Sequence, residues 1–337
     1  MKAELLELLR CPKTGQLLTI ESNDTFDGEI YSGMLVSEDG VNRYPIVNNI
    51  PRFVNPLNYA DNFGAQWNMF RRTQLDSYSG APISSDRFWL ATNWKPDNLR
   101  GQWILDVGCG AGRFAEVALN AGAKVVALDY SSAVDACYAN LKNHPNLHVV
   151  QGDIYALPFG DSIFPFIYSL GVLQHTPDVA KAFASLPAKL SPGGKLCVDY
   201  YWKRLRTLLN AKYLFRPFTK RMDHQKLFKF LQPKIPTLLM ISRGLGAVPI
   251  LGKGLKRLVP VADYVGIFPL TKMQLEEWAL LDTFDALGPQ YDSPQTFAAV
   301  KRGFEEAGLI NIEVGHWGHL VGRGSKPNFN NFAEKYR

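Results

Sequence analysis

The chain has 337 residues, of which 46% are hydrophobic and 20% are charged. This balance is that of an ordinary globular protein, and it excludes the disordered, collagen-like and disulfide-scaffold classes. The formal net charge of +6 is small but unevenly placed. Residues 203–257 hold fourteen Lys and Arg against one acid, so this segment carries about +13 and the rest about −7.

The four cysteines, Cys11, Cys109, Cys137 and Cys197, lie far apart and form no C-x-x-C pair. Such usage indicates a reducing compartment rather than a disulfide framework. The first ten residues carry charges and lack the apolar centre of a signal peptide. No apolar run reaches the roughly 18 residues that suggest a spanning helix. We therefore expect a cytoplasmic protein.

Two segments precede the main domain. Residues 1–55 contain short β-type runs, which are broken by turn signals at Gly15, Gly28 and Gly40. Residues 56–99 are rich in aromatic and amide side chains. The sequence thus predicts a small β-rich module, followed by a segment that is helical in pieces.

Residues 100–200 alternate between strand and helix patterns. Strands are predicted at 103–107, 124–128, 147–150, 164–170 and 195–200, and helices at 113–121, 131–142 and 180–190. This alternation is typical of a parallel sheet with helices on both faces. Pro165 lacks the N–H that a central strand needs, so the fourth strand is expected to begin after it.

The rhythm breaks in residues 201–270, which are basic, apolar by turns and contain six prolines. We interpret them as a helical insertion. Residues 271–337 are expected to complete the sheet, with a helix at 294–307 that Gly308 ends and a terminal hairpin at 310–317 and 319–322.

The strongest chemical signal is the glycine loop Asp106-Val-Gly-Cys-Gly-Ala-Gly-Arg113, which follows a strand and opens a helix. The next strand ends at Asp129, where an acid can take both ribose hydroxyls of an adenosine ligand. An NAD fingerprint has its third glycine one residue later than Gly112. The Asp106 carboxylate would repel a pyrophosphate but attract a sulfonium and an ammonium. The loop therefore favours S-adenosylmethionine (SAM) over NAD.

Further motifs follow in order. They are Val125–Asp129, Gln151–Ile154 with Leu157-Pro158-Phe159, Ser169–Asp178, and Leu190–Gly194. With the glycine loop they resemble the class I SAM-dependent methyltransferases, and Ser169–Asp178 resembles the UbiE/type-11 branch. The resemblance covers about residues 100–200 and 294–323. It implies an α/β, Rossmann-like fold with a seven-stranded, mostly parallel sheet that ends in an antiparallel hairpin, and SAM as the cofactor.

The resemblance also implies roles for single residues. Asp106, Gly108 and Gly110 would hold the methionine end of SAM. Asp129 and the following Tyr130 would lie at the ribose, Asp153 and Ile154 at the adenine, and Leu170 under the cofactor.

Residues 62–67 and 73–76 resemble a segment that precedes the glycine loop in methyltransferases of polysaccharide- and lipid-modifying pathways. This resemblance implies a segment that closes over the cofactor, where Gln66 and Gln74 donate hydrogen bonds. The alternative is a packing strip in which Phe63, Trp67 and Phe70 lie at helical spacing.

The first 55 residues resemble a Trm112-like or zinc-ribbon-like module in Leu8–Pro12, Tyr44–Ile46 and Ile50-Pro51. The metal-binding version has paired C-x-x-C motifs, whereas Cys11 stands alone here. One thiol cannot build a four-ligand zinc site. We therefore expect a metal-free module in which Cys11 is buried.

Methyl transfer is an in-line displacement, so alignment of the acceptor supplies most of the acceleration. His175 is the candidate general base for a hydroxyl acceptor, or alternatively a helix-start residue that only packs. Asp199 and Tyr200, at the end of strand five, are the other catalytic candidates, as groups that orient the acceptor. His316 and His319 are expected at the surface.

The basic insertion bears on the acceptor. Apolar residues interleaved with Lys and Arg predict amphipathic helices that lie on an anionic membrane surface, or a solvated lid. The leading hypothesis is O-methylation of a small-molecule or lipid- or glycan-linked acceptor, by a cytoplasmic protein that is peripheral on the inner face of the membrane. An RNA methyltransferase and a non-catalytic SAM-binding scaffold are the alternatives. No Asn-Pro-Pro-Tyr type motif of base-amine methyltransferases follows strand four.

Overall fold

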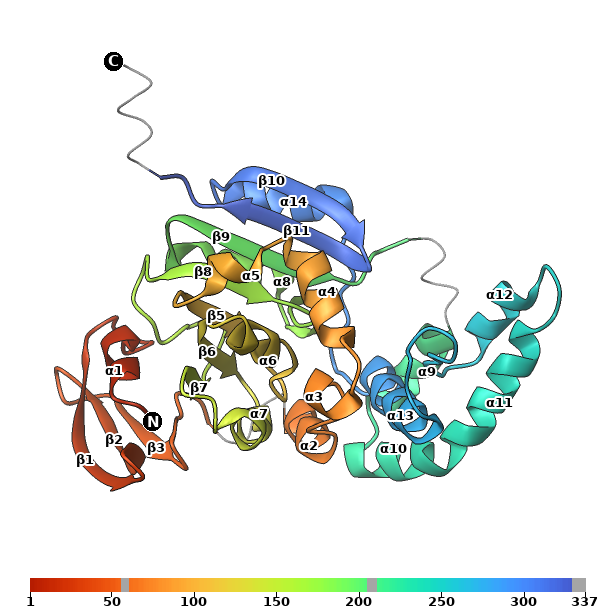
Figure 1. Ribbon diagram of the computed structural model, residues 1–337, viewed down its shortest axis with the longest axis horizontal. Helices are drawn as coiled ribbons and strands as arrows, with labels where there is room; N and C mark the ends of the chain where they lie inside the picture. Colours follow the sequence, from red (N-terminus) through yellow and green to blue (C-terminus); the bar gives the residue numbers. More distant parts are fainter. Residues whose placement is uncertain (56–60, 205–210, 329–337) are drawn as a thin grey trace, which may run out of the picture.

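The computed structural model describes residues 1–55, 61–204 and 211–328. The expectations for 56–60 and 205–210 therefore lie outside the described residues. A seven-stranded sheet forms the centre (Figure 1), in the order β10-β11-β9-β8-β5-β6-β7. The strands are β5 (Trp103–Val107), β6 (Lys124–Asp129), β7 (Leu147–Gln151), β8 (Phe164–Ser169), β9 (Leu190–Tyr200), β10 (Ile310–Trp317) and β11 (His319–Ser325).

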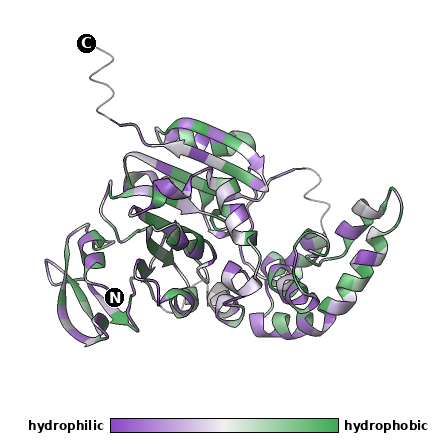
Figure 2. Ribbon diagram, viewed as in Figure 1, coloured by the Kyte–Doolittle hydropathy of each residue, from purple (hydrophilic) through white to green (hydrophobic). Residues whose placement is uncertain are grey.

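Strands β5 to β9 are parallel, whereas β11 runs antiparallel to both β9 and β10. This confirms the expected α/β fold class. Successive strand residues alternate between two cores: Leu105 and Val107 pack on one face, and Ile104 packs on the other. Because both faces of the central strands are buried, β5 and β6 consist mainly of apolar residues, as Figure 2 shows.

Helices cover both faces of the sheet. They are α4 (Ile83–Thr92), α6 (Arg113–Asn120) and α7 (Ala133–Leu141) on one face, and α8 (Val179–Ala184) and α14 (Phe297–Glu306) on the other. Two short 3-10 turns, Leu173–His175 and Pro187–Lys189, flank α8. The glycine loop and the residues that follow β6 and β8 thus lie together at the carboxyl edge of the parallel strands.

Pro165 does not delay the fourth strand, so that expectation was wrong. Strand β8 begins at Phe164, and the register with β9 shifts between Phe164 and Phe166, which pair with Leu190 and Lys195. Pro165 lies in this irregularity, where its missing N–H leaves no ladder bond unmade. Because Phe164 already pairs with Leu190, β9 begins at Leu190, which is five residues earlier than the sequence indicates.

The N-terminal segment forms a second, antiparallel sheet, β1-β2-β3-β4, after helix α1. The elements are α1 (Glu4–Leu8), β1 (Leu18–Phe26), β2 (Glu29–Ser37), β3 (Arg43–Val47) and β4 (Ile50–Pro51). Cys11 is buried, as expected. In the part of the chain that the structure describes, no cluster of three or more His, Cys, Asp or Glu could hold a metal ion.

This module is joined to the open edge of the central sheet beside β7. The Phe53 N–H donates to the Gln151 carbonyl at 2.8 Å, and Arg52 forms an ion pair with Asp135 of α7 at 2.6 Å. Gln151 in turn donates from its side chain to the Tyr130 carbonyl at 3.2 Å. The module therefore protects a strand edge and supports the loop that follows β6.

Two helical segments complete the described structure. The first comprises α2 (Asp61–Met69), α3 (Asp76–Ser79), α4 and α5 (Pro96–Leu99). The second comprises α9 (Ala211–Thr219), α10 (His224–Leu231), η4 (Gln232–Lys234), α11 (Ile235–Gly246), α12 (Gly252–Leu255), η5 (Lys256–Leu258) and α13 (Lys272–Leu287). We call residues 211–287 the cap.

Helix α13 was not expected, because residues 271–337 were assigned to the sheet. It packs instead against the insertion helices, where Leu281 and Phe284 share a buried core with Leu227, Leu231 and Leu239. The cap projects beside the sheet, away from the N-terminal module (Figure 1). No described helix is long and apolar enough to cross a bilayer.

The packing of α14 on β11 generates the first prediction. A Cβ atom on Gly322 would lie 2.5 Å from Phe304 and 2.7 Å from Val300. Gly322→Ala should therefore lower the free energy of unfolding by about 1–3 kcal/mol, since overpacking forces the core apart. Urea unfolding followed by circular dichroism measures this loss.

The matched control is Gly244→Ala in α11, where an added Cβ has no atom within 4 Å. Removing a glycine from a helix interior should stabilise the protein by about 0.5–1 kcal/mol. An unfolding midpoint of Gly322→Ala equal to that of the wild type would contradict the packing described here.

Candidate functional site

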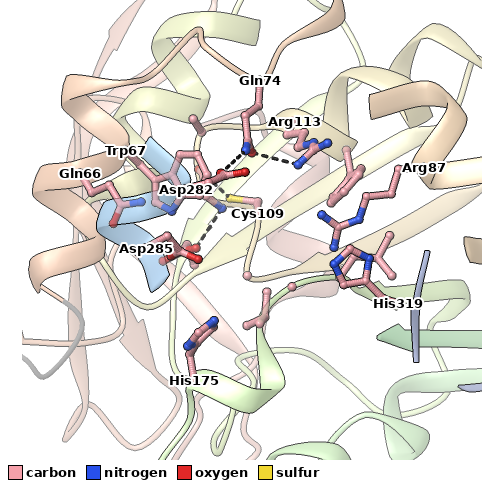
Figure 3. A pocket seen from close by; sticks show the side chains of 18 of the residues that line it. Gln66, Trp67, Gln74, Arg87, Cys109, Arg113, His175, Asp282, Asp285 and His319 are labelled. Carbon is pink, nitrogen blue, oxygen red and sulfur yellow. Dashed lines mark hydrogen bonds between the residues drawn. The ribbon is translucent and has the colours of Figure 1, made fainter. Parts of the chain in front are cut away.

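A cavity of about 570 Å³ opens at the carboxyl ends of β5, β6 and β8 (Figure 3). Its wall is built from several parts of the chain. They are the glycine loop, the residues after β6, β7, β8 and β9, the segment from Gln66 to Leu90, the cap from Ala262 to Ala286, and the hairpin at Trp317–His319. Open α/β sheets bind ligands at this edge.

The glycine loop forms one side of the cavity. Gly108 and Gly112 adopt φ angles of 85° and 93°, in the left-handed region that favours glycine. A Cβ on Gly108 would lie 2.4 Å from Val172, so the loop can lie against the end of β8 only without a side chain there. The backbone of Gly108 and Gly110 is thereby presented to the cavity.

Asp129 ends β6 in the cavity wall. Its Oδ2 accepts from the Gly110 N–H at 3.0 Å, and its Oδ1 accepts from the N–H and hydroxyl of Ser131 at 2.9 and 2.7 Å. The backbone N–H of Tyr130 is a further donor to this carboxylate, so a ligand hydroxyl at Asp129 would share or replace one of these bonds.

Asp106 does not line the cavity. It is buried behind the wall, and its Oδ2 has no hydrogen-bond partner among the described residues. Burial raises the pKa of Asp106 to about 8, and the negative charge of nearby Asp129 adds to the rise while the Tyr168 hydroxyl opposes it. Asp106 can thus favour a bound cation through its electric field, but not through direct contact.

The two glutamines differ. Gln66 is buried in the wall, and its amide nitrogen has no hydrogen-bond partner within the described residues, so this donor suits a ligand. Gln74 also lines the cavity, where it donates one amide N–H to Asp282 at 3.1 Å and accepts from Arg113 at 3.0 Å. Gln74 therefore links the cap to the glycine loop, and the second N–H of its amide is the donor that the expected bond to the cofactor would use.

Aromatic residues also lie in this segment. Trp67 lines the cavity, whereas Phe70 is buried in the cap core and contacts Phe228. The side chain of Phe63 lies outside the described part of the chain. The segment thus both packs and contributes to the wall.

At the adenine side of the expected cofactor, Tyr130, Ile154 and Leu170 line the cavity. Asp153 does not, and its carboxylate accepts from the Tyr155 N–H at 2.9 Å. The apolar wall suits a planar base, but the acid expected at its amino group lies outside the wall.

His175 lies in the wall at the end of β8. Its Nδ1 lies 3.1 Å from the carbonyl oxygen of Tyr291. A carbonyl only accepts, so a neutral His175 carries its proton on Nδ1, and Nε2 is then the proton acceptor. Tyr291 itself does not line the cavity.

Neither Asp199 nor Tyr200 lines the cavity, because both side chains are buried at the end of β9. Asp199 accepts from the Gly171 N–H and forms an ion pair with Arg87 at 2.8 Å. Arg87, the ion-pair partner of Asp199, and Tyr201, the residue after Tyr200, do line the cavity. Asp199 thus acts on the site through Arg87.

His319 was expected at the surface, and this was wrong. Strand β11 pairs with β9, with Leu320 opposite Tyr200, so the hairpin brings His319 into the cavity wall beside Arg87. The positive charge of Arg87, together with burial, lowers the pKa of His319 to about 4. His319 is therefore neutral at pH 7. His316 is exposed and lies against Trp202.

The cap contributes a polar cluster that the sequence did not reveal. Asp282 accepts from Tyr264, Trp278 and Gln74, and burial raises its pKa to about 6. Asp285 accepts from Tyr201 at 3.3 Å. No sequence motif includes Asp282 or Asp285 of the cap, and none includes Arg87 in α4. Arg113 alone had a signal, since it directly follows the third glycine.

The methyltransferase domain family matches residues 105–198. A ubiquinone biosynthesis O-methyltransferase of Coxiella burnetii is 31% identical over 164 residues, which cover 46% of this chain and 68% of that protein. A demethylmenaquinone methyltransferase of Renibacterium salmoninarum is 36% identical over 98 residues, or 29% of this chain and 40% of that one.

A sterol 24-C-methyltransferase of Saccharomyces cerevisiae is 30% identical over 149 residues, which cover 43% of this chain and 38% of the yeast protein. The chain thus spans less than half the length of two of these three relatives. The matched domain and the coverage of the O-methyltransferase establish that the chain belongs to the SAM-dependent methyltransferases.

Proposed function

We propose that this chain transfers the methyl group of SAM to a hydroxyl oxygen of an apolar acceptor, either a small molecule or a lipid- or glycan-linked one. The observation that carries the proposal is that one cavity joins the glycine loop and Asp129 to an aromatic wall, with His175 in the same cavity. SAM supplies a methyl group on a sulfonium, which needs no further activation.

The chain's own residues divide into two sets. The orphan donor of Gln66, the carboxylate of Asp129 and the backbone of Gly108 and Gly110 would hold the cofactor. Arg87 is the cation beside Gly171, and its Nε has no hydrogen-bond partner among the described residues, so it would take the carboxylate of the methionine part.

The second set faces the acceptor. Tyr264, Phe268, Trp278 and Trp317 form an aromatic wall that suits an apolar or ring-shaped molecule. The names of the relatives speak of ubiquinone, menaquinone and sterol biosynthesis, which agrees with an apolar acceptor. His175 would accept the acceptor's hydroxyl proton at Nε2, while Asp199 positions Arg87. Tyr200 would only support this wall from behind.

We also propose a division of the chain: a metal-free Trm112-like module at 1–55, a segment at 56–99 that covers the cofactor, the SAM-binding core at 100–200, and the cap as the acceptor lid. The boundary expected at residue 270 would move to about 287, because α13 packs within the cap. The protein would act in the cytoplasm, at the inner face of the membrane.

The first functional prediction concerns Asp129. Asp129→Ala should weaken SAM binding by about 10- to 100-fold, since a hydrogen bond to a charged group contributes about 1.5–3 kcal/mol. Isothermal titration calorimetry measures the affinity. Asp161→Ala is the control, because this acid is exposed and pairs only with Lys189 among the described residues. Unchanged affinity in Asp129→Ala would sink the assignment of the cofactor site.

The second prediction is a pH dependence. Asp106 has a pKa of about 8, so at pH 7 it is mostly protonated before the cofactor binds. A bound cation favours the carboxylate, so binding should release a proton, and SAM affinity should rise as the pH rises towards 8 and level off above it.

Calorimetry in buffers of different ionisation enthalpy counts the released protons. The α-amino group of SAM titrates near pH 8 as well, so the comparison with Asp106→Asn isolates the contribution of Asp106. Equal proton release by the wild type and Asp106→Asn would contradict the prediction.

The third prediction tests catalysis. His175→Ala should lower kcat by about 100- to 10,000-fold while SAM affinity stays within about twofold, because a general base acts on the acceptor. The assay follows tritiated methyl groups from SAM into an apolar extract of cells that lack the protein. No labelled product with wild-type protein that binds SAM would favour the non-catalytic scaffold.

A further inference from the structure

The cap carries an unusual share of exposed apolar surface. Of the 21 large apolar side chains that are exposed within the described residues, 13 lie in the cap. Six of them lie in residues 240–258, which comprise the end of α11, the following turn, α12 and η5. We call residues 240–258 the cap tip. Figure 1 shows the cap tip as the outermost part of the cap.

The turn of the cap tip is the most exposed point. Ile250 is fully exposed and Leu251 is 63% exposed. The backbone of Ile250 has a φ of 65°, which a β-branched residue rarely adopts. Because its side chain packs against nothing, folding gains no apolar burial from this conformation. Ile250 thus combines an exposed apolar side chain with a strained backbone. This combination makes it a candidate for contact with a binding partner.

The charge around this apolar tip has one sign. Residues 224–262 contain seven Lys and Arg and no Asp or Glu. The nearest acid is Asp263, which pairs with Arg243 at 3.3 Å and Lys256 at 3.0 Å, so the segment 224–263 keeps a surplus of +6 (seven cations minus one acid). Figure 2 shows hydrophobic and hydrophilic residues side by side along α11 and α12.

A surface with exposed aliphatic side chains at its tip and cations around them matches one partner chemistry, the interface of an anionic bilayer. There the side chains enter the acyl boundary while the cations meet lipid phosphates. We propose that the cap tip is a membrane-docking element that inserts Ile250 and Leu251 into an anionic lipid surface. This inference rests on the proposed function, because it names the surface from which an apolar acceptor would reach the cavity.

The cap tip is also connected to the cavity. Asp263, which Arg243 and Lys256 hold, lies between Ala262 and Tyr264, and both of these line the cavity wall. The Ala262 N–H is fixed in turn by the Thr283 hydroxyl of α13 at 3.0 Å. Docking at the tip would therefore place the acceptor side of the cavity, rather than the N-terminal module, next to the lipid.

The test uses the full chain and sedimentation with vesicles of phosphatidylcholine alone or of phosphatidylcholine mixed with phosphatidylglycerol. Wild-type protein should bind the anionic vesicles about tenfold or more tightly than the neutral ones, and less tightly as salt rises. The double variant Ile250→Asp/Leu251→Asp should lose about tenfold or more of this binding.

Phe26→Asp/Val41→Asp is the matched control. These two side chains are also apolar and largely exposed, at 73% and 75%, but they lie in the N-terminal module. It should bind vesicles like the wild type. Calorimetry with SAM on all three proteins separates the two proposals. Loss of SAM binding in the wild type would end the proposed function, whereas normal SAM binding without vesicle binding would end only the docking proposal.

Three further results would overturn docking. The first is equal vesicle binding by the wild type and the cap-tip variant. The second is binding of an RNA oligonucleotide that depends on the cap tip, without binding to vesicles. The third is a dimer in analytical ultracentrifugation that the cap-tip variant dissociates, again without binding to vesicles.

Discussion

The close approach of the glycine loop to the end of β8 is the constraint on which the site depends. Gly108 touches Val172 so closely that any side chain would separate them. This contact brings the backbone of the loop, the acid at the end of β6 and His175 after β8 to one cavity. Parallel strands that all end at the same edge make such a meeting possible, and the missing Cβ makes it tight.

Polar bonds connect the cap to this edge of the sheet. Arg113 beside the glycine loop bonds to Gln74, and Gln74 bonds to Asp282 of α13. Glu277 of the same helix accepts from Thr73 and Tyr78. The part of the cavity wall that the cap contributes is therefore positioned relative to the glycine loop by a few side chains rather than by the sheet.

The charged residues also differ between the sheet edge and the cap. The cofactor side collects buried carboxylates, with the pKa of Asp106 raised by burial, and these suit a cationic ligand. The cap is rich in Lys and Arg. Some of these side chains form ion pairs: Lys212 and Arg216 with Asp292, and Arg243 and Lys256 with Asp263. The basic surplus is thus partly structural, and its remainder lies on the outside of the cap.

The sequence by itself determined the α/β core, the SAM-dependent chemistry and the glycine loop that lines the cavity with Asp129. These features are local, because strand periodicity, the glycine spacing and the acid after β6 depend on near neighbours in the chain. The tertiary structure decided which face each side chain takes. It turned Asp199 and Asp106 behind the wall, tied Gln74 to Asp282 and Arg113, and brought His319 inward through the pairing of β11 with β9. It also supplied Arg87, Asp282 and Asp285 from helices far away in the chain. No local pattern marks such residues, because their positions depend on long-range packing between segments that only folding brings together.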